Sequence, residues 1–168
     1  AGNIPLQMHS HCQSGLSPEV YEIAIKSGFR FGYTATEPLA NGASLPATED
    51  IVARARRLGF DTSMNDEALA EVASYFHWVS EREGKPRGQI ATYSADLYEH
   101  QVPGGMISNL RSQLDTMKLG HRLPEILEEA ARVRHDLGYP IVVSPFAQYI
   151  VTQATLNVVQ GERYKTIP

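Results

Sequence analysis

The sequence contains a single cysteine, Cys12, so no disulfide can form within the chain. Such cysteine usage is typical of proteins that work in a reducing compartment. The sequence also lacks a signal-like segment and any apolar run long enough to span a membrane. We therefore expect a cytoplasmic protein.

An excess of positive charge is also missing. The 15 Lys and Arg residues are outnumbered by 19 Asp and Glu residues, and the net charge is −4. Because no run of basic residues occurs, binding to nucleic acid or to an anionic membrane is not expected. The hydrophobic content of 42% in 168 residues is enough for the chain to bury a core of its own.

Strands are scarce. Two segments read as convincing strands, the apolar stretch at residues 4–8 and the stretch Phe29–Thr36, and Ile141–Val143 is a third candidate. A closed βα barrel needs eight strands and typically about 250 residues. Two or three strands alone would leave sheet edges unpaired. We therefore expect another polypeptide, or a part of the same gene product outside this chain, to supply the missing strands.

Two histidines, His9 and His11, follow the first apolar stretch. Side chains alternate between the faces of an extended strand, so both histidines project the same way and can place two imidazole nitrogens on one metal ion. Neutral imidazole binds zinc and other divalent metals. A catalytic centre usually has at least three protein ligands, so the pair is incomplete. The alternative is a pair of strand histidines that bond to neighbouring backbone groups.

The segment between the two strands carries the signals of a helix. Ser17 is the expected N-cap, Pro18 lies in the first turn, and Gly28 is placed to end the helix. The expected buried face comprises Val20, Ile23, Ala24 and Ser27. Strand, helix and strand form a βαβ unit, whose functional residues lie at the carboxyl ends of the strands. His9 and His11 stand at such an end.

The rest of the chain has helical spacing of its apolar residues. One helix is expected from Pro46 to Leu58, and another begins near Asn65, with Leu69, Val72, Ala73 and Phe76 facing inward. Further helical patterns cover residues 110–117, 126–137 and 150–158. The polar segment 81–88 is the best candidate for an internal linker, although a solvated loop is the simpler interpretation.

Several short motifs occur in order along the chain. They are His9–Cys12 with Ser14–Gly15, Ala43–Glu49, Gln101–Met106 with Ser108–Leu110, Val133–Arg134 with Leu137–Pro140, Thr152–Ala154 and Gly161–Lys165. Together they resemble the carboxyltransferase domain of biotin-dependent enzymes, a family that includes pyruvate carboxylase, the oxaloacetate decarboxylase alpha subunit and transcarboxylase. The resemblance covers only the C-terminal part of that domain.

The resemblance implies an α/β fold in which the terminal βα units of a (β/α)8 barrel precede a mostly α-helical post-barrel region. On this basis, residues 1–60 correspond to the last strands and helices of a partial barrel. Residues 61–168 correspond to the helical carboxyltransferase region. The barrel is then completed by another chain or by a segment outside this sequence, and we expect an oligomer.

The resemblance also implies a reaction. Carboxybiotin enters a funnel between the barrel and the helices and exchanges its carboxyl group with the enolate of a small 2-keto acid such as pyruvate, which gives oxaloacetate. The sequence contains no biotin-attachment motif. The biotin is therefore expected on a separate domain or subunit, a biotin carrier protein.

In this family a divalent metal, for which Zn, Mn and Co are candidates, stands near the keto acid and stabilises negative charge that develops on oxygen. The two histidine ligands of the metal map onto His9 and His11. The other two ligands are an aspartate on the first strand and a carbamylated lysine on a middle strand. Neither has a counterpart in this sequence, nor has the arginine that holds the substrate carboxylate.

The proton-shuttling threonine of the family lies in a Thr-Pro-Ser-Ser-Gln type segment, which here reads Ser144-Pro145-Phe146-Ala147-Gln148. Ser144 keeps a hydroxyl that can both donate and accept, so we expect it to be the catalytic residue. Phe146 and Ala147 replace two small hydroxyl residues that help to hold the biotin ring. Without the family, Ser144 is most simply a turn residue before proline.

The resemblance assigns biotin or substrate binding to Gln148, Ala147, Gly104 and Gly105. The glycine pair allows close approach of the backbone and precedes a helix whose amide end can face an anion. By itself, such a pair is most simply a turn.

Two other functions remain open. A related barrel superfamily of metal-dependent aldol-type lyases and synthases also uses a His-x-His strand. The changes at Phe146 and Ala147 instead favour a diverged, non-catalytic assembly subunit. Dependence on biotin separates the carboxyltransferase from both.

Overall fold

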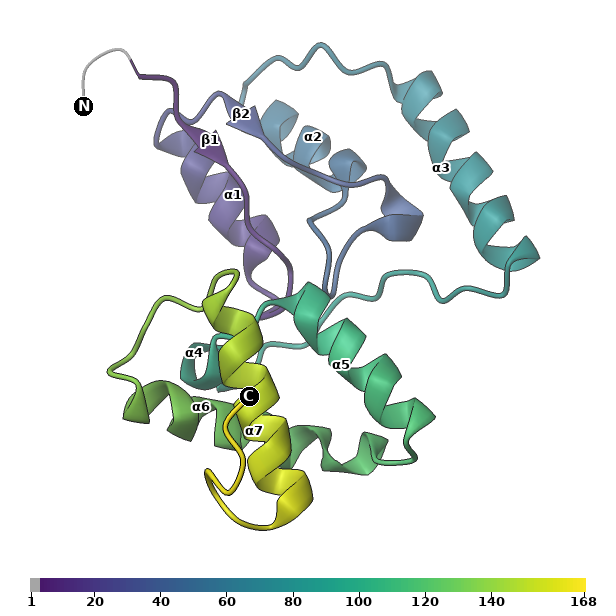
Figure 1. Ribbon diagram of the computed structural model, residues 1–168. Helices are drawn as coiled ribbons and strands as arrows, with labels where there is room; N and C mark the ends of the chain where they lie inside the picture. Colours follow the sequence, from purple (N-terminus) through teal and green to yellow (C-terminus); the bar gives the residue numbers. More distant parts are fainter. Residues whose placement is uncertain (1–3) are drawn as a thin grey trace. The chain divides into compact units, whose positions relative to one another are not determined.

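The computed structural model describes residues 4–168 and consists of two compact units. The first unit extends to Tyr93 and the second comprises Ser94–Pro168. Helices make up most of the second unit and less than half of the first, and the strands described all lie in the first (Figure 1). The two compact units divide after Tyr93. The resemblance places a functional division after residue 60 instead, and that division stays a prediction.

The first unit begins with the predicted βαβ arrangement. It contains β1 (Gln7–Met8), α1 (Ser17–Lys26) and β2 (Phe31–Gly32), and the two strands pair in parallel in the register Met8 opposite Gly32. Both strands are shorter than the sequence pattern predicts. Beyond β2, an isolated parallel bridge joins Ala35 to Ala47, because Thr48 N and Ala35 N bond to backbone oxygens of the other segment.

The structure corrects two details of α1. Its N-cap is Leu16, and the Ser17 hydroxyl donates a hydrogen bond to Ser10 O over 2.8 Å instead of capping the helix. The buried face comprises Ser17, Tyr21 and Ala24, whereas Val20 and Ile23 are exposed. Of the predicted face only Ala24 is buried. The face is rotated because the hydroxyls of Ser17 and Tyr21 bond to backbone groups at the ends of the strands.

Helix α2 (Thr48–Arg57), which the pattern of apolar residues predicts, packs against α1 in the first unit. Its Arg54 lies 3.3 Å from both Glu19 and Glu22 of α1, and these ion pairs tie the two helices together. The short helix η1 (Glu37–Leu39) precedes α2, and α3 (Asp66–Arg82) follows it. The N-cap of α3 is Asn65, whose side chain accepts a hydrogen bond from Ala68 N. The expected inward face of α3 is only partly covered, and Val72 is 44% exposed.

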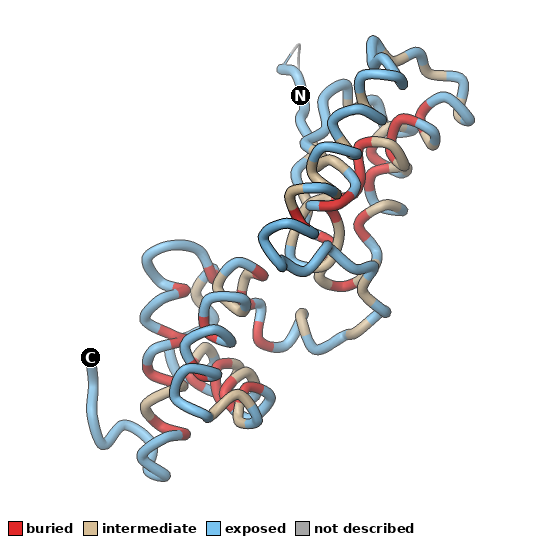
Figure 2. The backbone as a smooth tube through the Cα atoms, turned by 90° about the vertical axis from the view of Figure 1, so that its right-hand side faces the viewer, coloured by how far each residue is buried: buried red, intermediate tan, exposed pale blue. Residues whose placement is uncertain are grey.

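The second unit is a cluster of helices. They are α4 (Asp96–His100), α5 (Gly104–Thr116), η2 (Gly120–Arg122), α6 (Leu123–Asp136) and α7 (Phe146–Gln160). Its core is built mainly by α6 and α7, and Ile126, Ala130, Ile150 and Ala154 have no exposed surface. Figure 2 shows buried residues recurring at intervals along these helices, as the helical spacing of apolar residues predicts.

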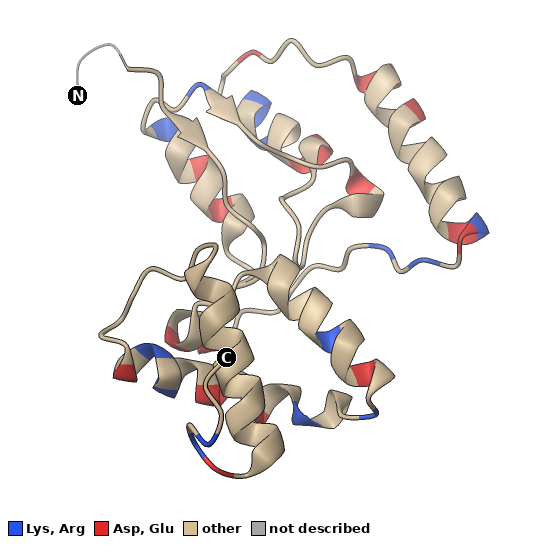
Figure 3. Ribbon diagram, in the orientation of Figure 1, with Lys and Arg blue, Asp and Glu red and all other residues tan. Residues whose placement is uncertain are grey.

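The third strand candidate is wrong. Ile141–Val143 pairs with no strand among residues 4–168, and Val143 N donates a hydrogen bond to Ile141 O over 3.0 Å, as in a tight turn. Val142 is buried in the core of the second unit, and the neighbouring Ile141 and Val143 are exposed. The segment connects α6 to α7. Helix α7 contains no Lys, Arg, Asp or Glu (Figure 3).

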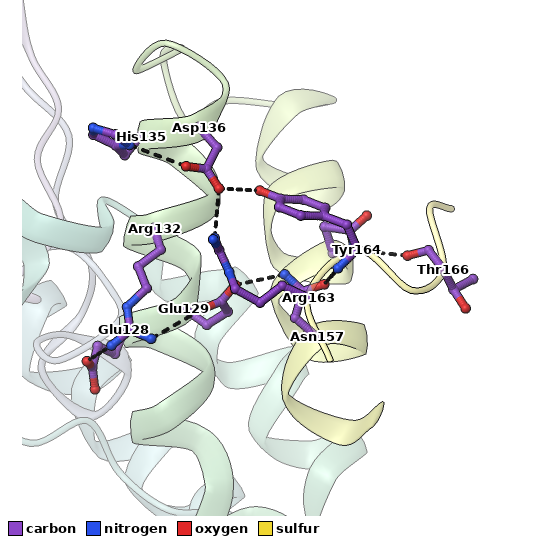
Figure 4. Close-up of polar contacts among 10 residues, drawn as sticks. Glu128, Glu129, Arg132, His135, Asp136, Asn157, Arg163, Tyr164 and Thr166 are labelled. Atoms are coloured by element: carbon purple, nitrogen blue, oxygen red, sulfur yellow. Dashed lines mark hydrogen bonds and ion pairs between the residues drawn. The ribbon is translucent and has the colours of Figure 1, made fainter. Parts of the chain in front are cut away.

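A buried polar network joins α6, α7 and the residues after α7 (Figure 4). Glu129 of α6 is 5% exposed and accepts hydrogen bonds from Asn157 Nδ2 and Arg163 Nε, both over 2.7 Å. Asn157 Oδ1 in turn accepts hydrogen bonds from Tyr164 N and Gln153 Nε2. The network thus fastens the motif at Gly161–Lys165 to the helices.

None of the helices described has an apolar stretch of the length that a bilayer crossing requires.

Candidate functional site

His9 and His11 lie just past the carboxyl end of β1, and their rings turn toward each other. The two Nε2 atoms are 3.3 Å apart. Two nitrogen ligands of a tetrahedral zinc ion, each about 2.0–2.1 Å from the metal, stand about 3.3–3.4 Å apart. The pair therefore fits joint coordination of one metal ion. Without a metal, the same separation allows one imidazole to donate a hydrogen bond to the other.

The protonation of His11 suits a metal ligand. Its Nδ1 lies 2.6 Å from Ala43 O, and since a carbonyl oxygen only accepts, Nδ1 carries the proton. In the neutral ring, Nε2 then presents its lone pair toward His9. The loop that supplies the carbonyl is itself held by backbone bonds from Asn41 N to Leu45 O and from Cys12 N to Ser44 O, both 2.8 Å.

The backbone between the two histidines is held by α1. Tyr21 Oη accepts a hydrogen bond from Ser10 N over 3.2 Å and donates one to Tyr33 O over 2.6 Å. The Ser17 hydroxyl donates to Ser10 O. Sequence patterns did not predict a role for Tyr21, Ser10 or Ala43 at the site.

Within residues 4–168, no group of three His, Cys, Asp or Glu residues is arranged to hold a metal ion. Cys12 follows the pair directly but is buried, and burial raises the pKa of its thiol. At neutral pH the thiol therefore keeps its proton in the metal-free chain. Metal binding by His9 and His11 therefore stays a prediction, and a complete centre would need ligands from outside the described residues.

Ser144 and Gln148 lie together at the start of α7 in the second unit. Gln148 Nε2 donates a hydrogen bond to Ser144 Oγ over 3.0 Å, and both residues are exposed. The two residues directly before Gln148 differ in exposure. Phe146 is 53% exposed, whereas Ala147 is 1% exposed and belongs to the hydrophobic core. The side chain of Ala147 thus packs inside the unit, and a contact of its side chain with a ligand stays a prediction.

Gly104 and Gly105 form the first turn of α5, as the sequence predicts, and Pro103 provides no side-chain cap for it. Gly104 is buried, whereas Gly105 is exposed and a Cβ there would contact nothing within 4 Å. The turn before the helix is held by His100, whose Nδ1 accepts a hydrogen bond from Val102 N over 2.8 Å. Burial lowers the pKa of His100, which keeps this acceptor neutral.

Comparison with known proteins relates these residues to one family. Residues 97–168 match the family model of the conserved carboxylase domain. One of the subunits of pyruvate carboxylase from Methanocaldococcus jannaschii is 42% identical over 168 residues, which cover 98% of this chain and 29% of that protein. The 2-oxoglutarate carboxylase large subunit of Hydrogenobacter thermophilus is 37% identical over 166 residues, which cover 99% of this chain and 26% of that protein.

The fold has a solved counterpart. The carboxyl transferase domain of Rhizobium etli pyruvate carboxylase superposes with a TM-score of 0.87 at 20% identity, and the match covers 98% of this chain and 28% of that one. The chain therefore spans less than a third of the length of these relatives.

Proposed function

We propose that the chain supplies the C-terminal part of a carboxyltransferase, because it belongs to the carboxyltransferase-domain family of biotin-dependent carboxylases. The reaction moves a carboxyl group between carboxybiotin and a 2-keto acid. The relatives are named for the carboxylation of pyruvate and of 2-oxoglutarate, and we propose a keto acid of this class as the substrate. The observation that carries the proposal is the 3.3 Å separation of the two histidine Nε2 atoms beyond β1.

His9 and His11 are proposed to hold a divalent metal through their Nε2 atoms. A bound metal supplies Lewis-acid stabilisation of the negative charge on the keto-acid oxygen. The hydrogen bond from His11 Nδ1 to Ala43 O sets the tautomer that leaves Nε2 available. The remaining ligands are proposed to come from the complementary part of the barrel.

Ser144 is proposed to move the proton. Its hydroxyl takes a proton from the carbon next to the keto group of the substrate and gives its own proton to the ureido nitrogen of biotin as the bond from that nitrogen to the carboxyl carbon breaks. The enolate then forms a bond to the released carboxyl carbon. Gln148 supports this role, because its amide donates to Ser144 Oγ and so orients the hydroxyl. Gly104 and Gly105 are proposed to bind an anionic or carbonyl group of biotin or substrate at the start of α5.

The βαβ unit is proposed to be the terminal part of a (β/α)8 barrel that another chain or segment completes. Three large side chains of β1, β2 and their extensions support this, because Leu6, Phe31 and Tyr33 are each about half exposed. A cavity of about 320 Å³ in the first unit is also lined by apolar side chains such as Ala24, Ile51 and Phe60. A biotin carrier protein and the complementary chain are the proposed partners, and the cytoplasm is the proposed compartment.

The test is a reconstituted transfer assay. The chain is combined with a polypeptide that supplies the earlier barrel strands and with a biotinylated carrier, and transfer from carboxybiotin to pyruvate and to 2-oxoglutarate is measured. We expect transfer to be lost, together with bound metal, in His9→Ala and His11→Ala. The matched control is His121→Ala, an exposed histidine of the second unit, which should keep both.

Three results would contradict the proposal. If His9→Ala transfers carboxyl groups at the rate of the wild type, the proposed metal role is contradicted. Aldol-type cleavage without any need for biotin would favour the lyase alternative, and the absence of every activity in the complete assembly would favour an assembly subunit.

A further inference from the structure

The parallel ladder of β1 and β2 is interrupted by a side chain. Its last direct backbone bond after the strands runs from Tyr33 N to Met8 O over 2.9 Å. In a continuing parallel ladder, the next bond would run from Ser10 N to Tyr33 O. These two groups bond instead to the same hydroxyl, since Tyr21 Oη accepts from Ser10 N and donates to Tyr33 O. A tyrosine hydroxyl thus stands in the place of one ladder bond.

The interruption falls on the histidine pair. In the register of Met8 opposite Gly32, the next pair would be His9 opposite Tyr33. Because the hydroxyl separates the strands at this point, the chain leaves the sheet between His9 and His11. The two peptide units that join the histidines are each held by one hydroxyl of α1: Tyr21 binds the amide of the first, and Ser17 binds the carbonyl of the second.

The two hydroxyls are placed to act on the backbone. Tyr21 and Ser17 are 1% and 2% exposed, and they lie one helical turn apart on the buried face of α1. Burial raises the pKa of the Tyr21 phenol, so the hydroxyl keeps the proton that it donates to Tyr33 O. Neither hydroxyl touches the imidazole rings in any hydrogen bond described, so both act through Ser10.

We propose that Tyr21 is a positioning residue, supported by Ser17, that presets the separation of His9 and His11. This inference rests on the metal role proposed above and adds the device that prepares it. Preorganised ligands bind metal more tightly because less ordering is left to occur on binding. Groups that orient metal ligands typically contribute about 10–100-fold to metal affinity.

The variant Tyr21→Phe removes one oxygen atom and leaves the ring in place. Ser10 N and Tyr33 O then either bond to each other or lose their partner, and each result moves the backbone between the histidines. Ile51→Val is the control, because it removes one methyl group from the buried core of the same unit without touching the hydroxyls. Circular dichroism and thermal unfolding establish that both variants are folded and similarly destabilised.

The first measurement uses the metal-free chain with ¹⁵N-labelled histidine. Imidazole ¹⁵N shifts report the tautomer of each ring, and a ring-to-ring Overhauser effect reports the contact of His9 with His11. In the wild type and in Ile51→Val we expect the proton of His11 on Nδ1 and a strong Overhauser effect. In Tyr21→Phe we expect changed shifts for both rings and a weaker Overhauser effect.

The second measurement is titration of the same chains with Co²⁺ alone, followed by visible absorption. We expect the affinity of Tyr21→Phe to fall by about 10–100-fold and that of Ile51→Val to stay within about twofold of the wild type.

The outcomes are separable. A folded Tyr21→Phe chain with unchanged imidazole signals and unchanged Co²⁺ affinity would overturn the inference. If the wild type binds no Co²⁺ while Tyr21→Phe still displaces the rings, the proposed metal role fails and the positioning role of Tyr21 stands. If Tyr21→Phe does not fold, Ser17→Ala decides: shifted His11 signals support the inference, and unchanged signals overturn it.

Discussion

Ser144 carries the hydroxyl on which the proposed proton transfer depends. It is exposed, and its Oγ accepts the hydrogen bond from Gln148 at the start of α7. We expect Ser144→Ala to lower carboxyl transfer in the complete assembly by about a hundredfold or more, the usual scale for a positioned proton-transfer group. Metal content and thermal stability should stay unchanged, because the lost hydroxyl is on the surface. The rate of carboxybiotin-dependent conversion between pyruvate and oxaloacetate is the measurement.

Two further variants control this experiment. Ser144→Thr keeps the hydroxyl and should keep activity, and Ser112→Ala removes an exposed serine of α5 and should change nothing. Near-normal turnover of Ser144→Ala would mean that the family's proton-shuttle role does not transfer to this position. The replacements at Phe146 and Ala147 would then mark an altered biotin site.

At the scale of elements, Asp136 links the end of α6 to the segment after α7. It accepts hydrogen bonds from Tyr164 Oη and Arg163 Nη2, both over 2.7 Å (Figure 4). The hydrogen bonds from Tyr164, His135 and Arg163 lower the pKa of Asp136 from 3.8 to about 2. A carboxyl whose pKa is lower in the folded state stabilises the fold above its unfolded pKa. This contribution is lost as the pH falls from about 3.8 toward 2.

Asp136→Asn should therefore weaken the acid dependence of stability between these pH values. Urea unfolding at a series of pH values from about 2 to about 5 measures it. Asp115→Asn, which removes one carboxylate from α5 of the same unit, is the control. Its free energy of unfolding should change with pH as steeply as that of the wild type. If the free energy of unfolding of Asp136→Asn falls with pH as steeply as that of the wild type, the contacts of Asp136 with Tyr164 and Arg163 do not persist in solution.

At the scale of the whole molecule, the two histidines provide fewer ligands than a stable metal centre needs, and residues 4–168 hold no third ligand beside them. We expect the chain alone to bind a divalent metal weakly and the reconstituted complex to bind it tightly. Elemental analysis of both samples after gel filtration is the measurement. One equivalent of metal retained by the isolated chain would contradict a centre that is shared with a complementary part.

The first unit should also associate through its strands. Edges of a two-stranded sheet present unpaired backbone groups, and large apolar side chains beside them are exposed. Light scattering of the isolated chain should show a species larger than a monomer. Phe31→Ser on β2 should reduce the molar mass of this species. Tyr75→Ser on α3, which removes an equally exposed aromatic ring, should leave the molar mass unchanged. A stable monomer would contradict the prediction.

The sequence by itself determined the features that depend on local spacing. The parallel βαβ arrangement and the helices α2, α3, α5, α6 and α7 follow from periods of 3.6 and 2 residues. The motifs also determined the family, because they occur in order over nearly the whole chain. The structural inferences succeeded because each depends on residues within one or two helical turns.

Only the tertiary structure decided which faces are buried and which polar groups meet. The helical pattern of α1 favoured Val20 and Ile23 as buried, but the hydroxyls of Ser17 and Tyr21 rotate the helix toward the strands. His11 meets Ala43 across 32 residues, and Glu129 meets Arg163 across 34. Periodicity carries no information about such distant pairs, because a hydrogen bond depends on where two segments come together in space and not on their spacing along the chain.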